Sequence, residues 1–213
     1  SVGVDLGLDE PQSLSITKGE KEMSILNRYL TENSGYSLSP TALFRYIECP
    51  LKFYLATIAD IKSTEELSDK IDALTFGNIL HEAMQELYTP LKKKEHANEM
   101  IANLRDKAKI EKVVDKTIGE LLDNNPNATK DEFSGDTLLV RDIIIKYIYK
   151  GVLHYDSNRD DFSIDDLEKP INYRYSISND RMVNLYGRAD RIDKINSNTL
   201  QIVDYKSGNT PHL

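Results

Sequence analysis

Two stretches near the end of the chain carry the residues best suited to chemistry. The first is YGRADRID, which contains Asp190, and the second is LQIVDYKSG, which contains Asp204 and Lys206. Both stretches are rich in branched and aromatic residues and are bounded by turn formers, so each predicts a β-strand. The polar link at 196–198 is typical of a hairpin, which predicts antiparallel neighbours that bring both aspartates into one region of space.

Strand geometry decides where these side chains point. Because side chains alternate along a strand, Asp204 and Lys206 share a face, while the side chain of Tyr205 points away and its carbonyl stays near them. Two carboxylates and a lysine at the end of a strand suit a hard cation and an activated water molecule. An aspartate and a lysine two residues apart are also common on solvated strand faces, where opposite charges simply coexist.

The apolar setting favours a site over a solvated face. Leu200, Ile202 and Val203 leave no clean polar face, so this strand is predicted to be buried on both sides. A charged pair at the end of a buried strand needs a functional reason, because burying charge is costly.

A histidine lies far upstream on a predicted helix at 75–91. His81 is on a stripe at the edge of the apolar face, and Gly77 one turn earlier leaves room for close approach. A lone histidine in such a position is more often structural than a ligand. The predicted buried stripe of the helix consists of Leu80, Ala83, Met84, Leu87 and Leu91.

Four motifs, in order, resemble the PD-(D/E)xK nuclease superfamily in its RecB-like form. The pattern of that family is Gly-x-x-Asp on one strand and Asp/Glu-x-Lys on the next, which 187–190 and 204–206 match. FGNILHE at 76–82 resembles the family's Gly-x-x-x-His helix. LSPTAL and CPLKFY, between 38 and 54, resemble the entry to the nuclease domain of AddB-type helicase–nuclease subunits. Each motif alone is weak, but the ordered set is specific.

The resemblance implies a role for each matched residue. Asp190 and Asp204 would hold Mg²⁺ or Mn²⁺ and belong to the catalytic set. His81 and the carbonyl of Tyr205 would complete the metal shell, and Lys206 would orient or deprotonate the attacking water. Oxygen-rich ligation favours these hard cations, and the histidine keeps Mn²⁺ competitive. The implied reaction is hydrolysis of phosphodiester bonds in DNA, with exonuclease action as the favoured mode.

The resemblance also implies partners. AddB-type subunits are parts of helicase–nucleases that repair DNA double-strand breaks by recombination, so DNA and a partner subunit are expected. A catalytically silent DNA-binding or scaffolding module of such a complex is the alternative, although the intact Asp190, Asp204 and Lys206 favour the enzyme. Arg191 is expected either to contact phosphate or to form a salt bridge with Asp193.

Two features of the family depend on sequence that this chain lacks. In AddB-like relatives a cysteine at the position of Cys49 joins three more to hold an iron–sulfur cluster. This chain has one cysteine, so a cluster is possible only in a longer parent. RecB-like relatives also continue past the lysine strand into a helix with a Gln-x-x-x-Tyr motif. The chain is therefore expected to be a fragment, weak or inactive as a nuclease by itself.

Composition limits the classes that remain. The 213 residues suffice for one sizeable core with a helical insert. A formal net charge of −8 argues against sequence-independent binding of nucleic acid through a broad basic surface. Carboxylates that hold cations count as negative in such a sum, so the charge does not exclude a nuclease. No apolar run reaches the roughly 18 residues that a membrane span needs. The single cysteine fits a reducing compartment, and the cytoplasm is the expected location.

The predicted architecture is an α/β restriction-endonuclease-like core with a mostly antiparallel sheet flanked by helices. Residues 1–36 are predicted to precede a nuclease domain at 37–213, with a helical insert at about 95–157 and a sheet core at about 168–208. A serine before a proline at 39–40 marks a helix start. His154 is expected to be structural, 92–94 a solvated basic helix end, and 158–166 an acidic loop. Further helices are predicted at 18–33, 95–124 and 137–155, and strands at 169–178, 182–195 and 200–206.

Overall fold

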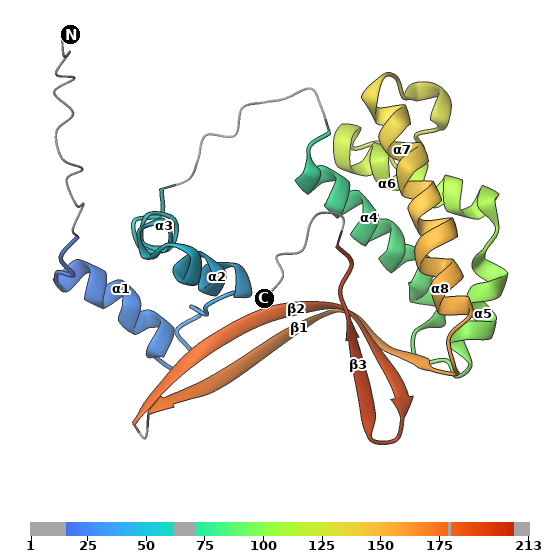
Figure 1. Ribbon diagram of the computed structural model, residues 1–213. Helices are drawn as coiled ribbons and strands as arrows, with labels where there is room; N and C mark the ends of the chain where they lie inside the picture. Colours follow the sequence, from blue (N-terminus) through green and yellow to red (C-terminus); the bar gives the residue numbers. More distant parts are fainter. Residues whose placement is uncertain (1–15, 62–70, 179, 207–213) are drawn as a thin grey trace, which may run out of the picture. The chain divides into compact units, whose positions relative to one another are not determined.

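The computed structural model describes residues 16–61, 71–178 and 180–206, which form two compact units. The first unit contains the described residues up to 61 together with those between 172 and 186. The second contains 71–171 and 187–206. Two long strands, β1 and β2, contribute residues to both units (Figure 1). Within these described ranges, no helix has the length and apolar character that crossing a membrane requires.

The first unit is built from short helices. They are α1 (Glu20–Leu30), α2 (Pro40–Glu48), α3 (Pro50–Phe53) and a π-helical turn, η1 (Tyr54–Ile58). The predicted start of α2 is confirmed, because the side chain of Ser39 accepts a hydrogen bond from the amide of Ala42 at 3.1 Å and Pro40 takes the first helical position. The amide of Leu38 donates to the carbonyl of Asn184 at 2.9 Å and so joins this segment to β2.

The second unit contains most of the core. Its helical elements are α4 (Ala73–Tyr88), η2 (Thr89–Leu91), α5 (Ala97–Leu104), α6 (Lys107–Asp123), η3 (Lys130–Glu132), α7 (Asp136–Lys146), the π-helical turn η4 (Tyr147–Val152) and α8 (Leu153–Ser157). Helix α4 packs against α6 and α7, and α5 packs against α8 (Figure 1). The predicted stripe is confirmed, since its four members on α4 and its last member, Leu91 in η2, are all buried. Each leucine or methionine of this stripe contributes about 1.5–3 kcal/mol to folding by leaving water.

The sheet positions both aspartates of the strand motifs. Its order is β1 (Ser163–Ser178), β2 (Arg181–Asn196), β3 (Thr199–Val203). Strands β2 and β3 are antiparallel, as predicted, with Arg191 opposite Val203 and an irregularity between Lys194 and Asn196. Asp190 and Asp204 each lie one residue beyond the Arg191–Val203 pair, so the hairpin brings the two positions to one edge of the second unit.

The predicted helix at 95–124 is wrong as a single element. Helix α5 ends at Leu104, and α6 begins at Lys107. Asp106 separates the two because its side chain accepts a hydrogen bond from the amide of Ala108 at 3.0 Å, which caps the new helix. The predicted helix at 137–155 forms as α7, η4 and α8 in direct succession.

The acidic segment at 158–166 is a loop only in its first part, because β1 begins at Ser163. The amide of Lys93 donates to the carbonyl of Ile164 at 2.7 Å, and its ammonium pairs with Asp165 at 2.6 Å. Lys92 pairs with Asp166 at 2.5 Å. The basic run that was expected to be a solvated helix end is therefore the partner of the acidic segment.

The expected burial of β3 on both sides is wrong. The side chains of Leu200 and Ile202 are on one face and remain 61% and 64% exposed. Val203 and Tyr205 instead belong to the face that packs against the helical core. Apolar composition alone cannot tell whether a second layer covers a strand, and the described helices cover only this one face.

Candidate metal centre

His81 stands at the centre of a group of polar atoms in the second unit. Its Nδ1 lies 3.4 Å from Oδ1 of Asp190 and 3.9 Å from Oε1 of Glu168. Its Nε2 lies 3.0 Å from the carbonyl oxygen of Tyr205. Hydrogen bonding to Asp190 raises the pKa of His81 above its usual value, against the opposing effect of burial. The histidine of the helix motif thus contacts residues from three other parts of the chain.

Asp190 is 7% exposed and is held by the backbone of the lysine motif. The amide of Tyr205 donates to Oδ2 of Asp190 at 2.6 Å, which leaves Oδ1 facing His81. Burial raises the pKa of Asp190, but hydrogen bonds from His81 and from the Tyr205 amide outweigh burial and leave the pKa below its usual value. Asp190 is therefore ionised at neutral pH and turns one oxygen toward the group.

Glu168 is the member of the group that sequence reasoning missed. It lies on β1 with a φ of 47°, a left-handed conformation that is unfavourable for a glutamate. Its side chain is 17% exposed and its Oε2 lies 3.5 Å from Arg188. Burial and then the negative charge of Asp190 raise the pKa of Glu168. The available signal was weak, because Glu168 sits between a predicted loop and a predicted strand and belongs to none of the motifs.

Asp204 and Lys206 lie outside this group of three. Oδ2 of Asp204 pairs with the ammonium of Lys206 at 3.0 Å, and the two side chains are 47% and 60% exposed. The carbonyl of Lys206 accepts a hydrogen bond from the hydroxyl of Tyr147 at 3.3 Å. Both residues follow β3 directly, next to Tyr205, so they lie at the edge of the site and remain open to solvent.

The group fits a cation by the chemistry of its donors. One atom each from His81, Glu168 and Asp190 lie within 4.8 Å of one another. When the Nε2 proton of His81 is donated to the carbonyl of Tyr205, Nδ1 carries a lone pair, so three acceptors converge with no hydrogen between them. A divalent cation satisfies such a set, and a proton on Nδ1 satisfies it only in part. The carbonyl of Tyr205, expected as a further ligand, faces the other ring nitrogen.

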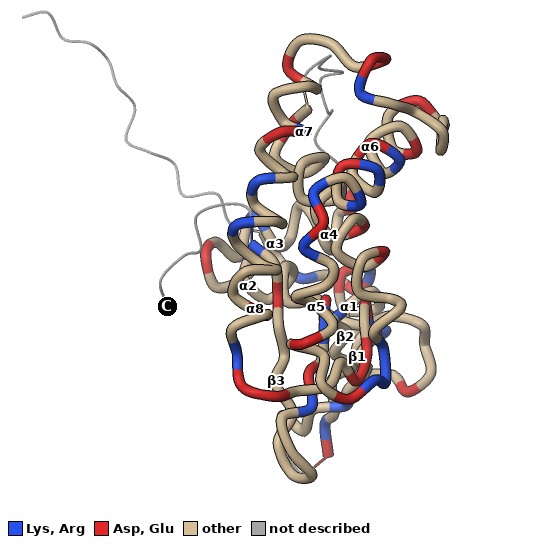
Figure 2. Tube along the Cα trace, turned by 90° about the vertical axis from the view of Figure 1, so that its right-hand side faces the viewer, with Lys and Arg blue, Asp and Glu red and all other residues tan. Residues whose placement is uncertain are grey.

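A pocket of about 620 Å³ opens beside the group. It is lined by α4 and α6 and includes Gly77, Glu82, Glu86 and Glu120 together with the three converging residues. Figure 2 shows acidic and basic residues intermixed along α6, whereas α4 carries acidic residues and no lysine or arginine. Among the charged residues of the pocket wall, the acidic ones outnumber Arg188, which fits cation binding better than direct contact with a phosphate backbone.

Arg191 does not contact solvent where a phosphate could reach it. It is 1% exposed and pairs with Asp156 at 2.7 Å and with Asp193 at 2.8 Å. The salt bridge with Asp193 is confirmed, and the alternative of a phosphate contact is wrong because the guanidinium is buried. His154 lies exposed in α8, where its carbonyl accepts a hydrogen bond from Asn158 at 2.6 Å, and Cys49 is a free thiol in the first unit.

Comparison with known proteins identifies the family. The family model of the PD-(D/E)XK nuclease superfamily matches residues 37–212. The chain belongs to the PD-(D/E)XK nuclease superfamily. This confirms the predicted fold class, and the antiparallel sheet flanked by helices is its core.

Three relatives, each named as one of the subunits of an ATP-dependent helicase/deoxyribonuclease, are similar over most of the chain. The one from Clostridium perfringens strain SM101 is 26% identical over 190 residues, which cover 84% of this chain and 16% of the relative. The one from Clostridium acetobutylicum is 29% identical over 222 residues, or 89% of this chain and 18% of the relative. The one from Clostridium tetani is 23% identical over 189 residues, or 82% of this chain and 16% of the relative. The chain therefore spans less than a fifth of the length of these relatives.

Proposed function

We propose that this chain is the metal-dependent deoxyribonuclease domain of an AddB-type helicase–nuclease subunit. The observation that carries the proposal is the convergence of His81, Asp190 and Glu168 beside the Asp204–Lys206 pair. These residues come from four separate stretches of the chain, so a chance cluster of exposed acids does not account for them. Membership of a nuclease superfamily and relatives named as helicase/deoxyribonuclease subunits support the same function.

His81, Asp190 and Glu168 would hold Mg²⁺ or Mn²⁺, because two carboxylate oxygens favour a hard cation and one imidazole nitrogen keeps Mn²⁺ competitive. A cation bound there supplies charge neutralisation at the phosphate and lowers the pKa of a water molecule. We include Asp204 in the proposed shell as the remaining carboxylate next to Asp190, while the carbonyl of Tyr205, which lies 3.0 Å from Nε2 of His81, would orient the imidazole.

Lys206 would act on the water and the phosphate. Its ammonium is 60% exposed, so it can turn from Asp204 toward a substrate without leaving a buried carboxylate unpaired. In that position it would orient the attacking water and stabilise the negative charge that develops on the phosphate oxygens. The amide of Tyr205 would keep Asp190 in place during this step through its 2.6 Å hydrogen bond.

The proposed substrate is DNA, and the proposed setting is a helicase–nuclease with a second subunit that repairs double-strand breaks. The names of the relatives contain both a helicase and a deoxyribonuclease activity. Because the net charge of this chain is −8, we expect most of the affinity for DNA to come from other parts of the assembly. We also propose a cytoplasmic location, and a role for Cys49 in an iron–sulfur cluster only in a longer parent protein.

The test is DNA cleavage by the full-length protein that carries this chain, with Mg²⁺, with Mn²⁺ and with chelator. Asp190→Asn and Lys206→Ala should each lower the cleavage rate by at least ~10²-fold with little loss of DNA affinity. The matched control is Lys194→Ala, which removes an exposed lysine from the same sheet. Cleavage at the wild-type rate in either variant would refute the enzyme assignment, and DNA binding without any cleavage by the wild type would favour the scaffolding alternative.

A further inference from the structure

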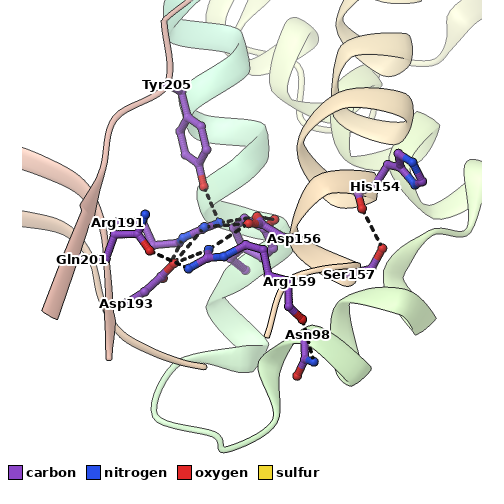
Figure 3. A network of polar contacts seen from close by, with 10 residues as sticks. Asn98, His154, Asp156, Ser157, Arg159, Arg191, Asp193, Gln201 and Tyr205 are labelled. Carbon is purple, nitrogen blue, oxygen red and sulfur yellow. Dashed lines mark hydrogen bonds and ion pairs between the residues drawn. The ribbon is translucent and has the colours of Figure 1, made fainter. Parts of the chain in front are cut away.

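Behind the candidate metal centre, the second unit contains a buried polar network centred on Arg191. Its guanidinium donates from Nη1 to Asp156 at 2.7 Å and to the hydroxyl of Tyr205 at 2.9 Å. It donates from Nη2 to Asp156 and to Asp193, both at 3.0 Å. Figure 3 shows the guanidinium between these groups, with Arg159 bridging the two aspartates from the other side. One side chain thus ties together several segments of the chain.

Three segments that the network reaches, which are α4, β2 and the residues after β3, also carry groups of the candidate site. Asp156 accepts a hydrogen bond from the hydroxyl of Tyr88 at 2.6 Å, and Tyr88 lies on α4, two turns after His81. The ring of Tyr88 also packs under the Arg191 guanidinium, with 4.9 Å between the ring centre and the guanidinium carbon. The network therefore fixes the helix that supplies the imidazole.

The network is also linked directly to Asp190 on β2 and to the backbone of Tyr205. Arg191 follows Asp190 on β2, so the two side chains point to opposite faces of the strand. The side chain of Tyr205 enters the network, while its amide donates to Asp190 at 2.6 Å and its carbonyl lies 3.0 Å from His81. A displacement of the Tyr205 ring would therefore move both backbone groups that hold Asp190 and His81.

The positive and negative charges of the network are equal in number, and its hydrogen bonds require the guanidinium of Arg191. Arg159 and Arg191 carry two positive charges, and Asp156 and Asp193 carry two negative charges, in a region where Arg191 is 1% exposed and Asp193 is fully buried. Arginine makes paired, planar contacts that a lysine cannot reproduce, so replacing Arg191 leaves carboxylate oxygens and the Tyr205 hydroxyl without a donor.

We propose that Arg191 is a positioning residue: through Tyr205, Tyr88 and its neighbour Asp190, it sets the distances between the groups that hold the divalent cation. This inference rests on the proposed function, because it assumes that the group at His81 binds a cation. Arg191 itself touches neither substrate nor metal. Its effect is on the geometry of residues that do.

The test compares Mn²⁺ affinity with stability in matched variants of the whole chain. Arg191→Lys should weaken Mn²⁺ binding about 10- to 100-fold, the usual effect of changing a residue that orients a ligand. The matched control is Arg141→Lys, which disturbs another buried ion pair of the second unit, between Arg141 and Asp115. The control should lose stability but bind Mn²⁺ with wild-type affinity, because that pair does not touch the site.

A milder variant guards against loss of folding. Tyr205→Phe removes only the hydroxyl that accepts from Arg191, and it should weaken Mn²⁺ binding about fivefold. In chelator, the exchange of the Tyr205 amide hydrogen with solvent should become faster in both variants and stay unchanged in Arg141→Lys. This readout needs no metal and reports the backbone contact to Asp190 directly.

The outcomes separate the two claims. If Asp190→Asn abolishes Mn²⁺ binding while Arg191→Lys and Tyr205→Phe bind it like the wild type, the site stands and the positioning role is refuted. If Arg191→Lys does not fold, the affinity and amide exchange of Tyr205→Phe decide the question. If Asp190→Asn binds Mn²⁺ as tightly as the wild type, the cation site is elsewhere, and both the proposed function and this inference are overturned.

Discussion

Neutralising Glu168 should have opposite effects on the protein without and with metal. In chelator, Glu168 and Asp190 are two carboxylates held close together, and burial together with Asp190 raises the pKa of Glu168. Glu168→Gln keeps the shape of the side chain and removes one of the two charges. The variant should therefore be more stable than the wild type in chelator and should lose much of the stabilisation that Mn²⁺ gives.

The structure sets the size of both effects. The facing oxygen atoms of Glu168 and Asp190 lie within 4.8 Å of each other, so at an effective dielectric constant of ~20 their repulsion is about 3.5 kcal/mol. Since His81 and solvent offset part of it, we expect a gain of about 1–2 kcal/mol in chelator. Mn²⁺ at ~100 times its dissociation constant should stabilise the wild type by about 2.7 kcal/mol, or about 5–11 °C for a chain of this size. If Glu168→Gln binds ~100-fold more weakly, only about 0.4 kcal/mol remains at that concentration.

The assay is differential scanning calorimetry at pH 8 in chelator and across a Mn²⁺ titration. Because the chain has two compact units, the transition to follow is the one that responds to Mn²⁺. Glu95→Gln is the control, since it removes an exposed negative charge from the same unit. The control should melt like the wild type in chelator and show the full shift with Mn²⁺.

One result would refute the reasoning. If Glu168→Gln melts below the wild type in chelator and keeps the full Mn²⁺ shift, the glutamate is neither part of a repelling pair nor a ligand. The half-buried position and left-handed backbone of Glu168 would then serve packing alone. An equal response in Glu95→Gln would show that the effect comes from the net charge of the chain rather than from the site.

Three further predictions concern other parts of the second unit. Asp204→Asn should change the stability in chelator by less than ~0.5 kcal/mol, because its pair is exposed, but should lose most of the Mn²⁺ shift measured by calorimetry. Gly119→Ala should cost about 1–3 kcal/mol in urea unfolding, because a Cβ would lie 2.3 Å from a backbone oxygen, whereas Gly151→Ala, with nothing within 4 Å, should be neutral or stabilising. Burial raises the pKa of Asp156, but the hydrogen bonds and charge of Arg191 lower it below its usual value, so its contribution is complete above about pH 4 and is lost at lower pH. The difference in unfolding free energy between wild type and Asp156→Asn should therefore shrink as the pH falls from 6 to 3.

Local sequence rules were sufficient to predict the helices and strands whose ends are marked by capping or turn residues. The serine–proline start of α2, the buried stripe of α4 and the hairpin between β2 and β3 all follow from capping, periodicity and turn residues. The same rules predicted that the hairpin would bring Asp190 and Asp204 into one region, and the register places each of them one residue beyond the Arg191–Val203 pair. These rules failed at Asp106, which is an ordinary helix residue by periodicity and becomes a cap only through its own backbone contact.

Long-range partners could not be predicted from local pattern. The order of the three strands follows from their short connections, but the meeting of Glu168 on β1 and Asp190 on β2 with His81 on α4 has no signal in the sequence around Glu168. The basic run was expected to be a solvated helix end and the acidic segment a loop, since opposite charges far apart in sequence give no sign that they will form ion pairs such as Lys92–Asp166 and Lys93–Asp165. Leu200 and Ile202 were predicted to be buried and are exposed, because an apolar side chain does not reveal whether another part of the chain packs on it.

The motif GRADRID illustrates why a site can be predicted while its support is missed. Along β2 the side chains alternate, so Arg188 and Asp190 belong to the face of Glu168 and His81. Arg191 and Asp193 are offset by one residue and lie in the buried network with Asp156. The motif therefore encodes two adjacent structures, a candidate cation site on one face and a charge-balanced scaffold on the other. An interpretation of the sequence that treats every charged residue of the strand as a ligand or as solvated misses the buried network. The burial of Arg191 depends on partners from α4 and α8, which the sequence of the strand does not indicate. Variants of this motif should accordingly fall into two classes: substitution of Asp190 should change metal binding directly, and substitution of Arg191 or Asp193 should change it through Tyr205.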